Sequence, residues 1–579
     1  MPEAPKRLAK ETEMLESVGG KGPLATLGIY MKLSGPGWLQ SAITLGGGSL
    51  GSSLFLGVMA GFGMMWLQPV AMLMGVIMLS AIAYVTLATG ERPFDAIRKH
   101  VNPALAWGWA IATLMANMVW AMPQFSLATG ALEQNLLPGM VDGDGAKWAV
   151  GIGLLVICTA IIWSYDKGGK GVAVFELILK IIVGLIVLSF VGVVVALSMQ
   201  GAISWGAIFS GLVPDFSLLS KPADTYSPYL DVLGQSKGYW TDHIVSTQKN
   251  IMIAAVATAV GINMTFLLPY SMLKKGWNAK FRGLAIFDLS TGLFIPYVVA
   301  TGCVVIAAAA QFHPSDSAHF KQIEAGLDQQ IAYIDRAEQM SDDAGAKFLV
   351  AKGVSSKFVK GYRQNLKGYW DKTHMAVSAG DKKIAALLIK RDTGALAKSL
   401  EPFLGETVAQ KIFGFGVLAM AFSTAIILML INGFVVCEML GFKDNAKWHR
   451  IGCVAAGITG LLGARLIWGG ANTAWLVMPT STIGMILLPV AYITFFFMMN
   501  SRGLLGDKMP RGLNRVVWNS LMGVATAFAS YAAMMSIEGK TKMLGQTNWQ
   551  EKDIAYAMVG LFVLSVVVAQ VIKCKKSKG

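Results

Sequence analysis

Long apolar stretches recur from one end of the chain to the other, separated by shorter polar segments. Twelve of them have roughly 20 residues or more, the length at which a helix crosses a hydrocarbon core of about 30 Å. They lie at residues 35–60, 63–88, 104–129, 147–165, 171–199, 249–273, 281–311, 412–440, 450–468, 472–499, 515–537 and 553–573. The pattern predicts an all-α integral membrane protein with about twelve transmembrane helices.

The polar segments divide these crossings into groups. We predict a cytosolic N-terminal arm at 1–34, transmembrane helices 1 to 5 at 35–199, an extracytoplasmic loop at 200–248, transmembrane helices 6 and 7 at 249–311, an extracytoplasmic helical insertion at 312–411, transmembrane helices 8 to 10 at 412–499, and transmembrane helices 11 and 12 with a basic C-terminal tail at 500–579. Within the insertion, Phe320, Ile323, Leu327 and Ile331 have the spacing of one helical face. The insertion is either a decoration without a role in transport or a regulatory element.

The composition agrees with a membrane-embedded chain. Apolar residues make up 54% of the 579 residues and charged residues only 14%, against roughly 25% charged residues in soluble domains. Among the short loops, most of the lysines and arginines lie on one side, and the positive-inside rule places that side, with both termini, in the cytosol. We therefore expect a multi-pass protein of the plasma membrane.

The net charge of +15 has the same topological explanation, so a nucleic-acid partner is not expected. The expected partners are the lipid bilayer and a small solute or ion, and the oligomeric state is left open. The five cysteines stand singly, and no nucleophile with its base, and no phosphate loop, occurs at a usable spacing. We therefore expect no disulfide, no cofactor and no enzymatic activity.

The first apolar stretch contains three consecutive glycines, Gly46, Gly47 and Gly48, between Thr44 and Ser49. Glycine weakens a helix because it loses the most backbone entropy when its conformation is fixed. Irregular backbone is tolerated within a membrane only where it lines a protected cavity. Close helix packing through small residues is the alternative explanation, but three consecutive glycines do not share one helical face. The segment is therefore predicted to interrupt the first helix at a substrate site.

The sixth apolar stretch has a comparable interruption, in which Thr258, Val260, Gly261 and Asn263 precede Pro269. Breaks in the first and sixth helices are what an inverted repeat of five plus five helices produces, with the substrate held between half-helix ends. Helices 1 to 5 and 6 to 10 are thus predicted to form the two repeats. The predicted substrate-binding residues are Thr44, Gly46, Gly47, Gly48, Ser49, Thr258, Val260, Gly261 and Asn263.

The segment Gly35–Gly37 (Gly-Pro-Gly), followed by an apolar pair and Ser41, resembles the start of the first helix in the Nramp family of divalent-metal transporters, which share the LeuT-type fold. The resemblance continues through the sixth helix, the segment 421–441 and the segment that ends at Pro489. It covers nearly the whole chain apart from the insertion and the final helix. It implies a LeuT-type 5+5 inverted repeat with helices 1 and 6 broken, and transport as the function.

The resemblance also identifies positions at which this chain differs from the family. The family's metal-binding Asp-Pro-Gly-Asn motif matches residues 46–49, which read Gly-Gly-Gly-Ser, so both side-chain ligands are missing. The family's sixth-helix motif Ala-x-x-Met-Pro-His-Asn matches residues 257–263, where Val260 replaces the methionine ligand and Ile262 the histidine associated with proton movement. Divalent ions need carboxylate, imidazole or sulfur ligands. No metal site is therefore predicted.

The family's proton route in the third helix contains an Asp and a Glu, which align with Pro123 and Ser126 here. No acidic residue lies between Met115 and Ala131, and the nearest, Glu133, is at the outer end of the predicted helix. Transport driven by protons along this route is therefore not expected.

Three ionisable residues lie in the cytosolic halves of the predicted crossings, Glu176 and Lys180 in the fifth and Asp288 in the seventh. Such groups are functional candidates by default, so one interpretation is an inner-gate network. The other is pairing of Glu176 with Lys180, which are four positions apart on one helix. Arg465, near the outer end of the ninth helix, is expected to reach the membrane interface. Uncharged polar residues that either line a cavity or hydrogen-bond between helices are Gln40, Thr44, Asn117, Gln124, Thr258, Ser423, Thr424 and Thr480.

Three functions are compatible with these observations. The residues favour transport of a small polar, zwitterionic or anionic solute, because half-helix N-termini attract electron-rich groups and Gly46 leaves no carboxylate to oppose them. The resemblance favours transport of a divalent cation, Mg²⁺ or Mn²⁺. The third function is a sensor that keeps the fold without transporting.

Overall fold

The computed structural model describes residues 3–18, 22–141, 143–166, 169–201, 203–315, 318–390, 393–442, 445–467, 477–540 and 550–576. These residues form helices joined by short turns, and they contain no β-strand. Eleven of the described helices are long and apolar enough to cross a membrane, or twelve when one bent pair counts as a single crossing. The predicted all-α membrane fold with about twelve crossings is confirmed.

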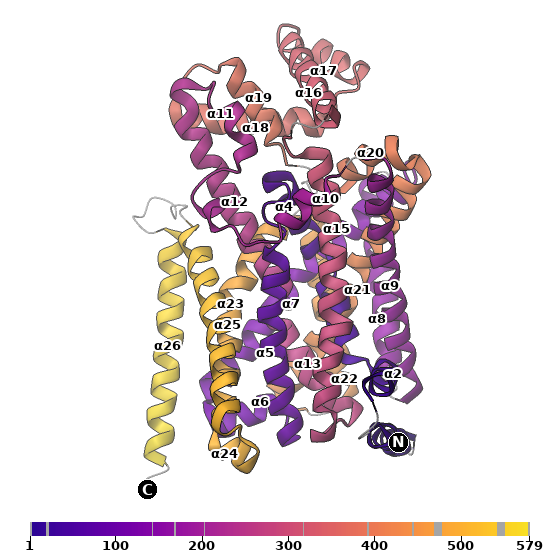
Figure 1. Cartoon of the computed structure of the whole chain (residues 1–579), viewed down its shortest axis with the longest axis vertical. Coiled ribbons are helices and arrows are strands. Elements are labelled where there is room, and N and C mark those ends of the chain that lie inside the picture. The colour runs from indigo at the N-terminus through magenta and orange to yellow at the C-terminus, as the bar shows by residue number, and fades with distance from the viewer. Residues whose placement is uncertain are drawn as a thin grey trace.

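The crossings run along one another in a single bundle (Figure 1). They are α3 (Pro36–Thr44) with α4 (Gly47–Ala60), α5 (Leu67–Thr89), α7 (Pro103–Ala131), α8 (Gly143–Asp166), α9 (Gly169–Met199), α12 (Lys237–Ala259) with α13 (Ile262–Lys275), α14 (Arg282–Leu289) with α15 (Ile295–Phe312), α21 (Phe413–Leu440), α22 (Ala446–Leu462), α23 (Val477–Met499), α25 (Gly512–Glu538) and α26 (Glu551–Lys576). The start of the predicted tenth crossing, at 472, lies outside the described residues. Helices α7 and α21 pack along each other, and α15 packs against α4.

Two crossings are interrupted, the first and the sixth. Helices α3 and α4 meet at a bend of 54°, and Gly46 between them is extended, with φ −122° and ψ −177°. Between α12 and α13, Val260 and Gly261 are both extended. Each break leaves backbone groups of the helix ends without partners in their own helix. The protein thus has the LeuT-type 5+5 arrangement with helices 1 and 6 broken.

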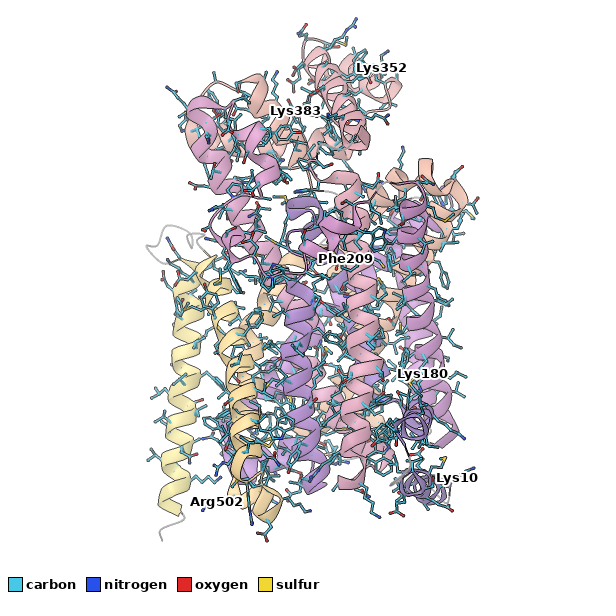
Figure 2. All side chains as sticks on the ribbon, in the orientation of Figure 1. Lys10, Lys180, Phe209, Lys352, Lys383 and Arg502 are labelled. Atoms are coloured by element: carbon cyan, nitrogen blue, oxygen red, sulfur yellow. The ribbon has the colours of Figure 1, made fainter. Side chains whose placement is uncertain are left out.

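Both chain termini lie at one end of the bundle, which we call the terminal end, and the predicted insertion lies at the other, which we call the insertion end (Figure 1). Figure 2 shows Lys10 and Arg502 near the terminal end and Lys352 and Lys383 at the insertion end. The N-terminal arm contains the helices α1 (Glu3–Ser17) and α2 (Pro23–Leu33). The insertion contains α16 (Ala318–Ala337), α17 (Asp342–Ala351), α18 (Ser356–Thr373), α19 (Ala379–Leu387) and α20 (Thr393–Leu404).

The segment 200–248, predicted as a structured loop, contains short helices. They include α10 (Trp205–Ser210) and α11 (Ser227–Leu230), and α12 already begins at Lys237, ahead of the predicted start at 249. The extension of α12 carries Trp240, whose indole N–H donates to the Asp381 carboxylate of the insertion over 2.8 Å. Trp240 also stacks on Tyr369, with ring centroids 5.6 Å apart. The segment and the insertion therefore pack together as one layer over the bundle.

Candidate substrate site between two broken helices

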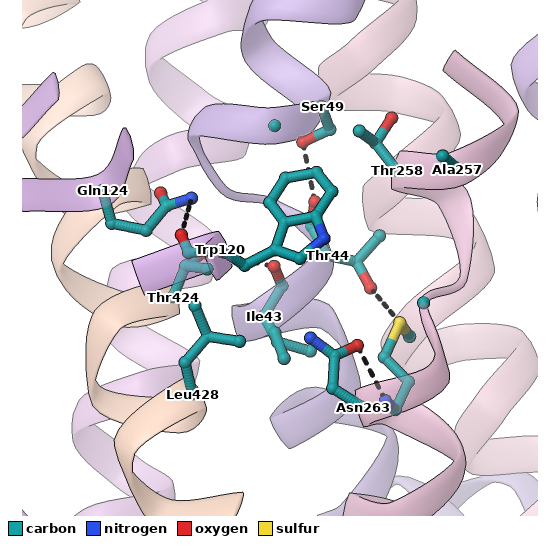
Figure 3. Close-up of a pocket in the computed structure, with 13 residues that line it drawn as sticks. Ile43, Thr44, Ser49, Trp120, Gln124, Ala257, Thr258, Asn263, Thr424 and Leu428 are labelled. Carbon is teal, nitrogen blue, oxygen red and sulfur yellow. Dashed lines mark hydrogen bonds between the residues drawn. The ribbon is translucent and has the colours of Figure 1, made fainter. Parts of the chain in front are cut away.

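A small cavity lies where the α3–α4 break faces the α12–α13 break (Figure 3). Its volume, counted as the space open to the centres of water molecules, is about 30 Å³, which is room for roughly two or three waters. The surrounding side chains come from α3, α4, α7, α12, α13 and α21. They are Ile43, Thr44, Gly48, Ser49, Trp120, Gln124, Ala257, Thr258, Gly261, Asn263, Met264, Thr424 and Leu428.

Six of the nine predicted substrate-binding residues line this cavity, namely Thr44, Gly48, Ser49, Thr258, Gly261 and Asn263. Val260 does not, because its side chain packs against Gly75 of α5, where an added Cβ would lie only 2.0 Å from a Val260 methyl group. The Val260 side chain therefore belongs to helix packing in this structure. Gly46 and Gly47 also lie outside the cavity wall, and each of them contacts a neighbouring helix instead.

Each of the three consecutive glycines faces a side chain of a neighbouring helix. An added Cβ at Gly46 would lie 2.1 Å from the Thr424 hydroxyl of α21, and one at Gly48 would lie 2.3 Å from the Trp120 ring of α7. The glycines point in different directions, yet all three admit a close neighbour. Close packing, which the sequence analysis set aside because the glycines share no face, therefore explains them as well as access to a ligand does.

Three backbone N–H groups at the two breaks already have neutral acceptors. Gly47 donates to the Gln124 side-chain oxygen over 3.0 Å, and Gly46 donates to the Ser49 hydroxyl over 3.2 Å. At the second break, Met264 donates to the side-chain oxygen of Asn263 over 2.9 Å. The positive ends of α4 and α13 are thus partly satisfied by the protein. This weakens the expectation that the site attracts an anion.

The cavity wall combines polar groups with apolar surface and carries no ionisable side chain. Its polar groups are hydroxyls, two side-chain amides, an indole and a thioether. In the described part of the chain, no group of three or more His, Cys, Asp or Glu residues is placed to hold a metal ion. Helix α7 carries no acidic residue, and Glu133 pairs with Lys147 beyond the end of α7.

Sequence reasoning missed five residues of the wall, which are Ile43, Trp120, Ala257, Met264 and Leu428. Trp120 is four positions before Gln124 on α7, so their helical spacing was a usable signal. Met264 follows the last position of the family motif, and its sulfur lies 3.1 Å from the Thr44 hydroxyl. A thioether is therefore present one position beyond Asn263. Of the uncharged polar residues singled out beforehand, Thr44, Gln124, Thr258 and Thr424 line the cavity, while Gln40, Asn117, Ser423 and Thr480 are buried outside its wall.

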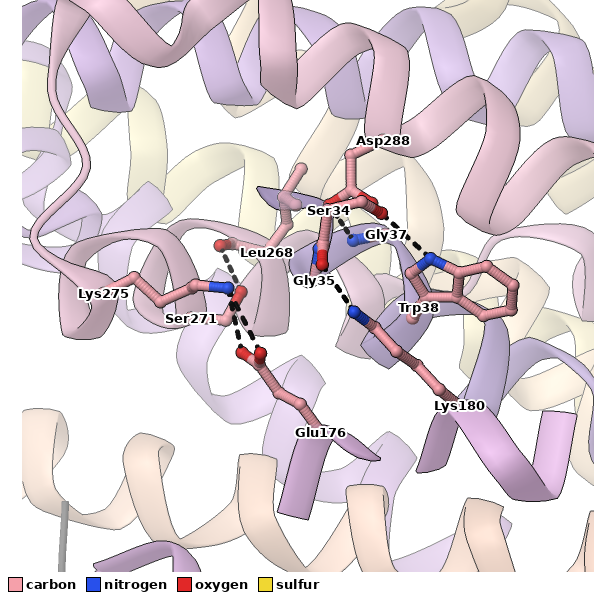
Figure 4. Close-up of polar contacts among 10 residues, drawn as sticks. All are labelled: Ser34, Gly35, Gly37, Trp38, Glu176, Lys180, Leu268, Ser271, Lys275 and Asp288. Carbon is pink, nitrogen blue, oxygen red and sulfur yellow. Dashed lines mark hydrogen bonds and ion pairs between the residues drawn. The ribbon is translucent and has the colours of Figure 1, made fainter. Parts of the chain in front are cut away.

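Toward the terminal end, Asp288 of α14 holds the start of α3 (Figure 4). Its carboxylate accepts the backbone N–H of Gly37 over 2.7 Å, that of Gly35 over 3.1 Å, and the Ser34 hydroxyl. The Lys180 ammonium donates to the Ser34 carbonyl over 2.6 Å. Gly37 has to be glycine, because an added Cβ would lie 2.1 Å from the Asp288 carbonyl oxygen.

Glu176 does not depend on its own helix for a counterion. Its carboxylate forms an ion pair with Lys275 at the end of α13, with 3.2 Å between the charged atoms and both side chains at most 8% exposed. Glu176, Lys180 and Asp288 therefore connect α9, α13, α14 and the start of α3. This network extends beyond the alternative of an ion pair within one turn of α9. Arg465 likewise has a partner, the Asp144 carboxylate at 2.6 Å.

A cavity between two broken helices, inside a bundle of about twelve crossings, is the arrangement of a secondary transporter. The sequence model described as Natural resistance-associated macrophage protein-like (Nramp) matches residues 37–333 and 377–537. The chain belongs to the Nramp family of membrane transporters. The segment between the two matched ranges lies within the insertion, and no curated protein shows significant similarity to the sequence.

Solved structures with the same fold include the manganese transporter of Eremococcus coleocola. Its complex with an aromatic bis-isothiourea substituted compound has a TM-score of 0.59 and 13% identity, with 94% of this chain and 96% of that chain covered. A histidine-to-alanine mutant of that transporter has a TM-score of 0.59 and 12% identity over the same shares of the two chains. A glutamate-to-alanine mutant has a TM-score of 0.52 and 12% identity, again over the same shares. At such identities the similarity shows the fold alone.

Proposed function

We propose that this transporter carries a small polar solute without net charge, dipolar or zwitterionic, through the cavity between its broken helices. The observation that supports this most directly is the cavity wall, which offers hydrogen-bonding groups but no ionisable side chain. A divalent ion gives up much of its hydration when it is bound, and carboxylates normally offset that cost. Hydroxyls and amides replace hydrogen bonds of a neutral solute without any countercharge.

The helix ends around the cavity suit a dipolar cargo. The N-termini of α4 and α13 carry partial positive charge, and the C-termini of α3 and α12 carry partial negative charge. All four ends lie at the two breaks. An anion has less support than a dipolar solute, because the N–H groups of Gly46 and Gly47 already have acceptors.

The cargo-bound state has to be wider than the state described here. A volume of about 30 Å³ holds only a few waters, and Trp120 occupies the space beside Gly48. Movement of the Trp120 ring enlarges the cavity without moving α7, the helix that carries this side chain. We therefore propose that Trp120 is the side chain that yields when cargo enters.

A second candidate function, transport of a divalent cation such as Mn²⁺ or Mg²⁺, is favoured by family membership and by one feature of the wall. Met264 presents its sulfur to the cavity one position beyond Asn263, and thioethers favour soft transition metals. The solved structures with the same fold are those of a manganese transporter. Against this stands the lack of any carboxylate on the wall.

We also propose that the terminal end faces the cytosol at the plasma membrane and that the insertion lies outside. The support is the positive-inside pattern of the short loops. A Lys352→Cys variant in a Cys574→Ser background tests the proposal. The proposal expects labelling of intact cells by an impermeant thiol reagent, and labelling only after permeabilisation would contradict it.

The cargo proposal is tested by a thermal-shift screen of the purified protein with amides, polyols, amino acids, organic acids, Mg²⁺ and Mn²⁺, followed by uptake of each hit into liposomes. Thr258→Val, which removes a hydroxyl from the wall, is expected to abolish most of the uptake. Thr494→Val is the matched control, because that buried hydroxyl donates to a carbonyl within its own helix α23. Stabilisation by divalent ions alone would contradict the proposal, and stabilisation without uptake would point to a sensor.

A further inference from the structure

Three basic side chains gather around Tyr84 of α5 at the terminal end of the bundle. Arg282 begins α14, Lys508 lies in the turn before α25, and Arg515 lies in the first turn of α25. We propose that these three residues, which we call the Tyr84 cluster, bind the headgroup phosphate of an anionic phospholipid. The lipid is a bound partner of the protein and is separate from its cargo.

The Tyr84 side chain brings the three segments together. The guanidinium carbon of Arg282 lies 4.2 Å from the centroid of the Tyr84 ring, and the Tyr84 hydroxyl donates to the Lys508 carbonyl over 2.9 Å. The ring of Trp518 packs against the same ring, with centroids 5.9 Å apart. Arg515 lies three positions before Trp518 on α25, and residues at this spacing are neighbours on a helix surface. The three positive charges therefore lie around one residue.

Arg282 has no counterion among the described residues. In that part of the chain its guanidinium contacts the Tyr84 ring alone, and its Nε atom is buried without a hydrogen-bond acceptor. Stacking on a ring covers one face of the guanidinium and leaves its N–H groups, which point outward in its plane, able to donate. A buried donor without an acceptor is costly. An anionic group from outside the chain would supply the missing acceptor.

The other two cations have only neutral acceptors among the described residues. The Lys508 ammonium donates to a backbone carbonyl of α5 over 2.7 Å, and the Arg515 guanidinium donates to an asparagine side-chain oxygen over 3.3 Å. Asp507, which is next to Lys508 in the sequence, already pairs with Arg511 over 2.6 Å. The cluster thus carries three positive charges that no described carboxylate neutralises.

The surface next to the cluster suits acyl chains, which distinguishes a phospholipid from free phosphate. Leu73, Ile77 and Tyr84 are spaced as one face of α5, and Leu73 is 46% exposed. Helix α25 packs beside α5 (Figure 1) and exposes Leu521 and Val524, by 41% and 59%. Exposed apolar side chains of membrane crossings face lipid tails. The apolar face of α5 leads to Tyr84, and tyrosine is common where a membrane meets water.

The charge of the cluster favours an anionic headgroup over a zwitterionic one. A guanidinium matches the oxygens of a phosphate with paired hydrogen bonds, and each basic residue near a membrane surface adds to the attraction for anionic lipid. The headgroup of phosphatidylcholine brings its own ammonium, which the three cations repel. Phosphatidylglycerol has the same phosphate without that positive charge.

The cluster shares a helix with the residue that holds the start of α3. Arg282 is the first residue of α14, and Asp288 of the same helix accepts the backbone N–H groups of Gly35 and Gly37. A headgroup bound to Arg282 and Lys508 joins the start of α14 to the turn before α25. The lipid therefore stabilises the helix on which the start of α3 depends.

The experiment measures binding of radiolabelled short-chain phosphatidylglycerol to the delipidated, purified full-length protein by scintillation proximity. The wild type is expected to bind it saturably, with weak competition by phosphatidylcholine and by inorganic phosphate. Arg282→Gln is expected to weaken binding by about tenfold, and Lys508→Gln by about fivefold. Arg98→Gln is the matched control, because Arg98 also lies over an aromatic ring but pairs with Asp95 over 3.1 Å. It should bind like the wild type.

The proposal would be overturned by a wild type without saturable binding, or by unchanged binding in Arg282→Gln and Lys508→Gln. An equal loss in Arg98→Gln would show that general surface charge attracts the lipid. Competition by inorganic phosphate as strong as that by phosphatidylglycerol would overturn the assignment to a lipid. Size-exclusion profiles show whether each variant folds, and Lys508 lies in an exposed turn, so its variant tests the proposal even if Arg282→Gln misfolds.

Discussion

The start and the end of α3 are built from different chemistry, although they are only about two turns apart. At its start, the Asp288 carboxylate accepts two backbone N–H groups and a hydroxyl, and the Lys180 ammonium donates to a carbonyl nearby. At its end, the cavity wall has hydroxyls, amides, an indole and a thioether but no charged group. Buried charges are costly unless they are paired and hydrogen-bonded. Charge at the start of α3 therefore holds helices together, whereas the groups around the cavity are neutral.

The most severe test of this contrast is Asp288→Asn. An amide cannot accept three hydrogen bonds in place of a carboxylate, so the start of α3 should be destabilised against α14 by about 3 kcal/mol. We expect a cysteine introduced at Thr44 to be labelled faster from the terminal end. Asp507→Asn is the control, because its side chain is fully exposed beside Arg511. Unchanged labelling in Asp288→Asn would show that this carboxylate does not restrict access to the cavity from the terminal end.

The ion pair between Glu176 and Lys275 should stabilise the fold because each charge neutralises the other. Removing one charge should therefore cost more stability than removing both. Glu176→Gln leaves the Lys275 ammonium, only 5% exposed, without its counterion, and we expect a loss of about 3 kcal/mol. The double variant Glu176→Leu/Lys275→Met removes both charges and should recover most of that loss. Thermal unfolding in detergent measures both. A double variant as unstable as the sum of its single variants would contradict a pairing role.

At the start of the insertion, His313 is a buried, neutral histidine. His313 bonds through Nδ1 to the Val58 carbonyl over 3.0 Å and through Nε2 to the Thr225 hydroxyl over 2.8 Å. A neutral ring with its proton on Nδ1 satisfies both partners, and burial lowers the pKa of His313 to about 4. The unfolded chain, with a pKa of about 6.5, takes up the proton first as the pH falls.

The stability that His313 contributes is therefore complete above pH 6.5 and is lost as the pH falls from about 6.5 toward 4, by about 3 kcal/mol. Unfolding temperatures of the wild type and His313→Gln at pH 7.5 and pH 4.5 test this expectation. The wild type should lose more stability than the variant over this interval. Equal losses would show that His313 titrates normally.

The smallest effect is expected at Arg465. Its guanidinium pairs with Asp144 over 2.6 Å, but the Asp144 side chain is 90% exposed. Solvent screening makes such pairs worth no more than about 1 kcal/mol. Asp144→Asn should shift the unfolding temperature very little and should leave uptake unchanged. A large shift would mean that charge matters at the insertion end as much as at the start of α3.

The sequence predicted the breaks better than it predicted the contacts around them. The consecutive glycines that begin at Gly46 and the pattern around Gly261 indicate local backbone preferences. Such signals can be recognised from the sequence alone. The partner of Glu176 could not be predicted from the sequence, because Lys275 lies 99 positions away. Only the packing of α9 against α13 brings the two residues together.

The cavity wall shows the same limit. Val260 was assigned to the site by matching a family motif, yet it packs against Gly75. Met264 was overlooked because it lies one position beyond that motif. Which side of a broken helix faces a cavity depends on the rotation of the second half relative to the first. Spacing along the sequence does not determine that rotation.

The most direct test of the central claim is uptake of Mn²⁺ at micromolar concentration by liposomes that contain the purified wild-type protein. The uncharged wall predicts no saturable uptake above that of protein-free liposomes, whether or not a pH gradient is applied. Saturable Mn²⁺ uptake that Met264→Leu reduces and Thr494→Val leaves unchanged would contradict the account and assign the cavity to a metal ion.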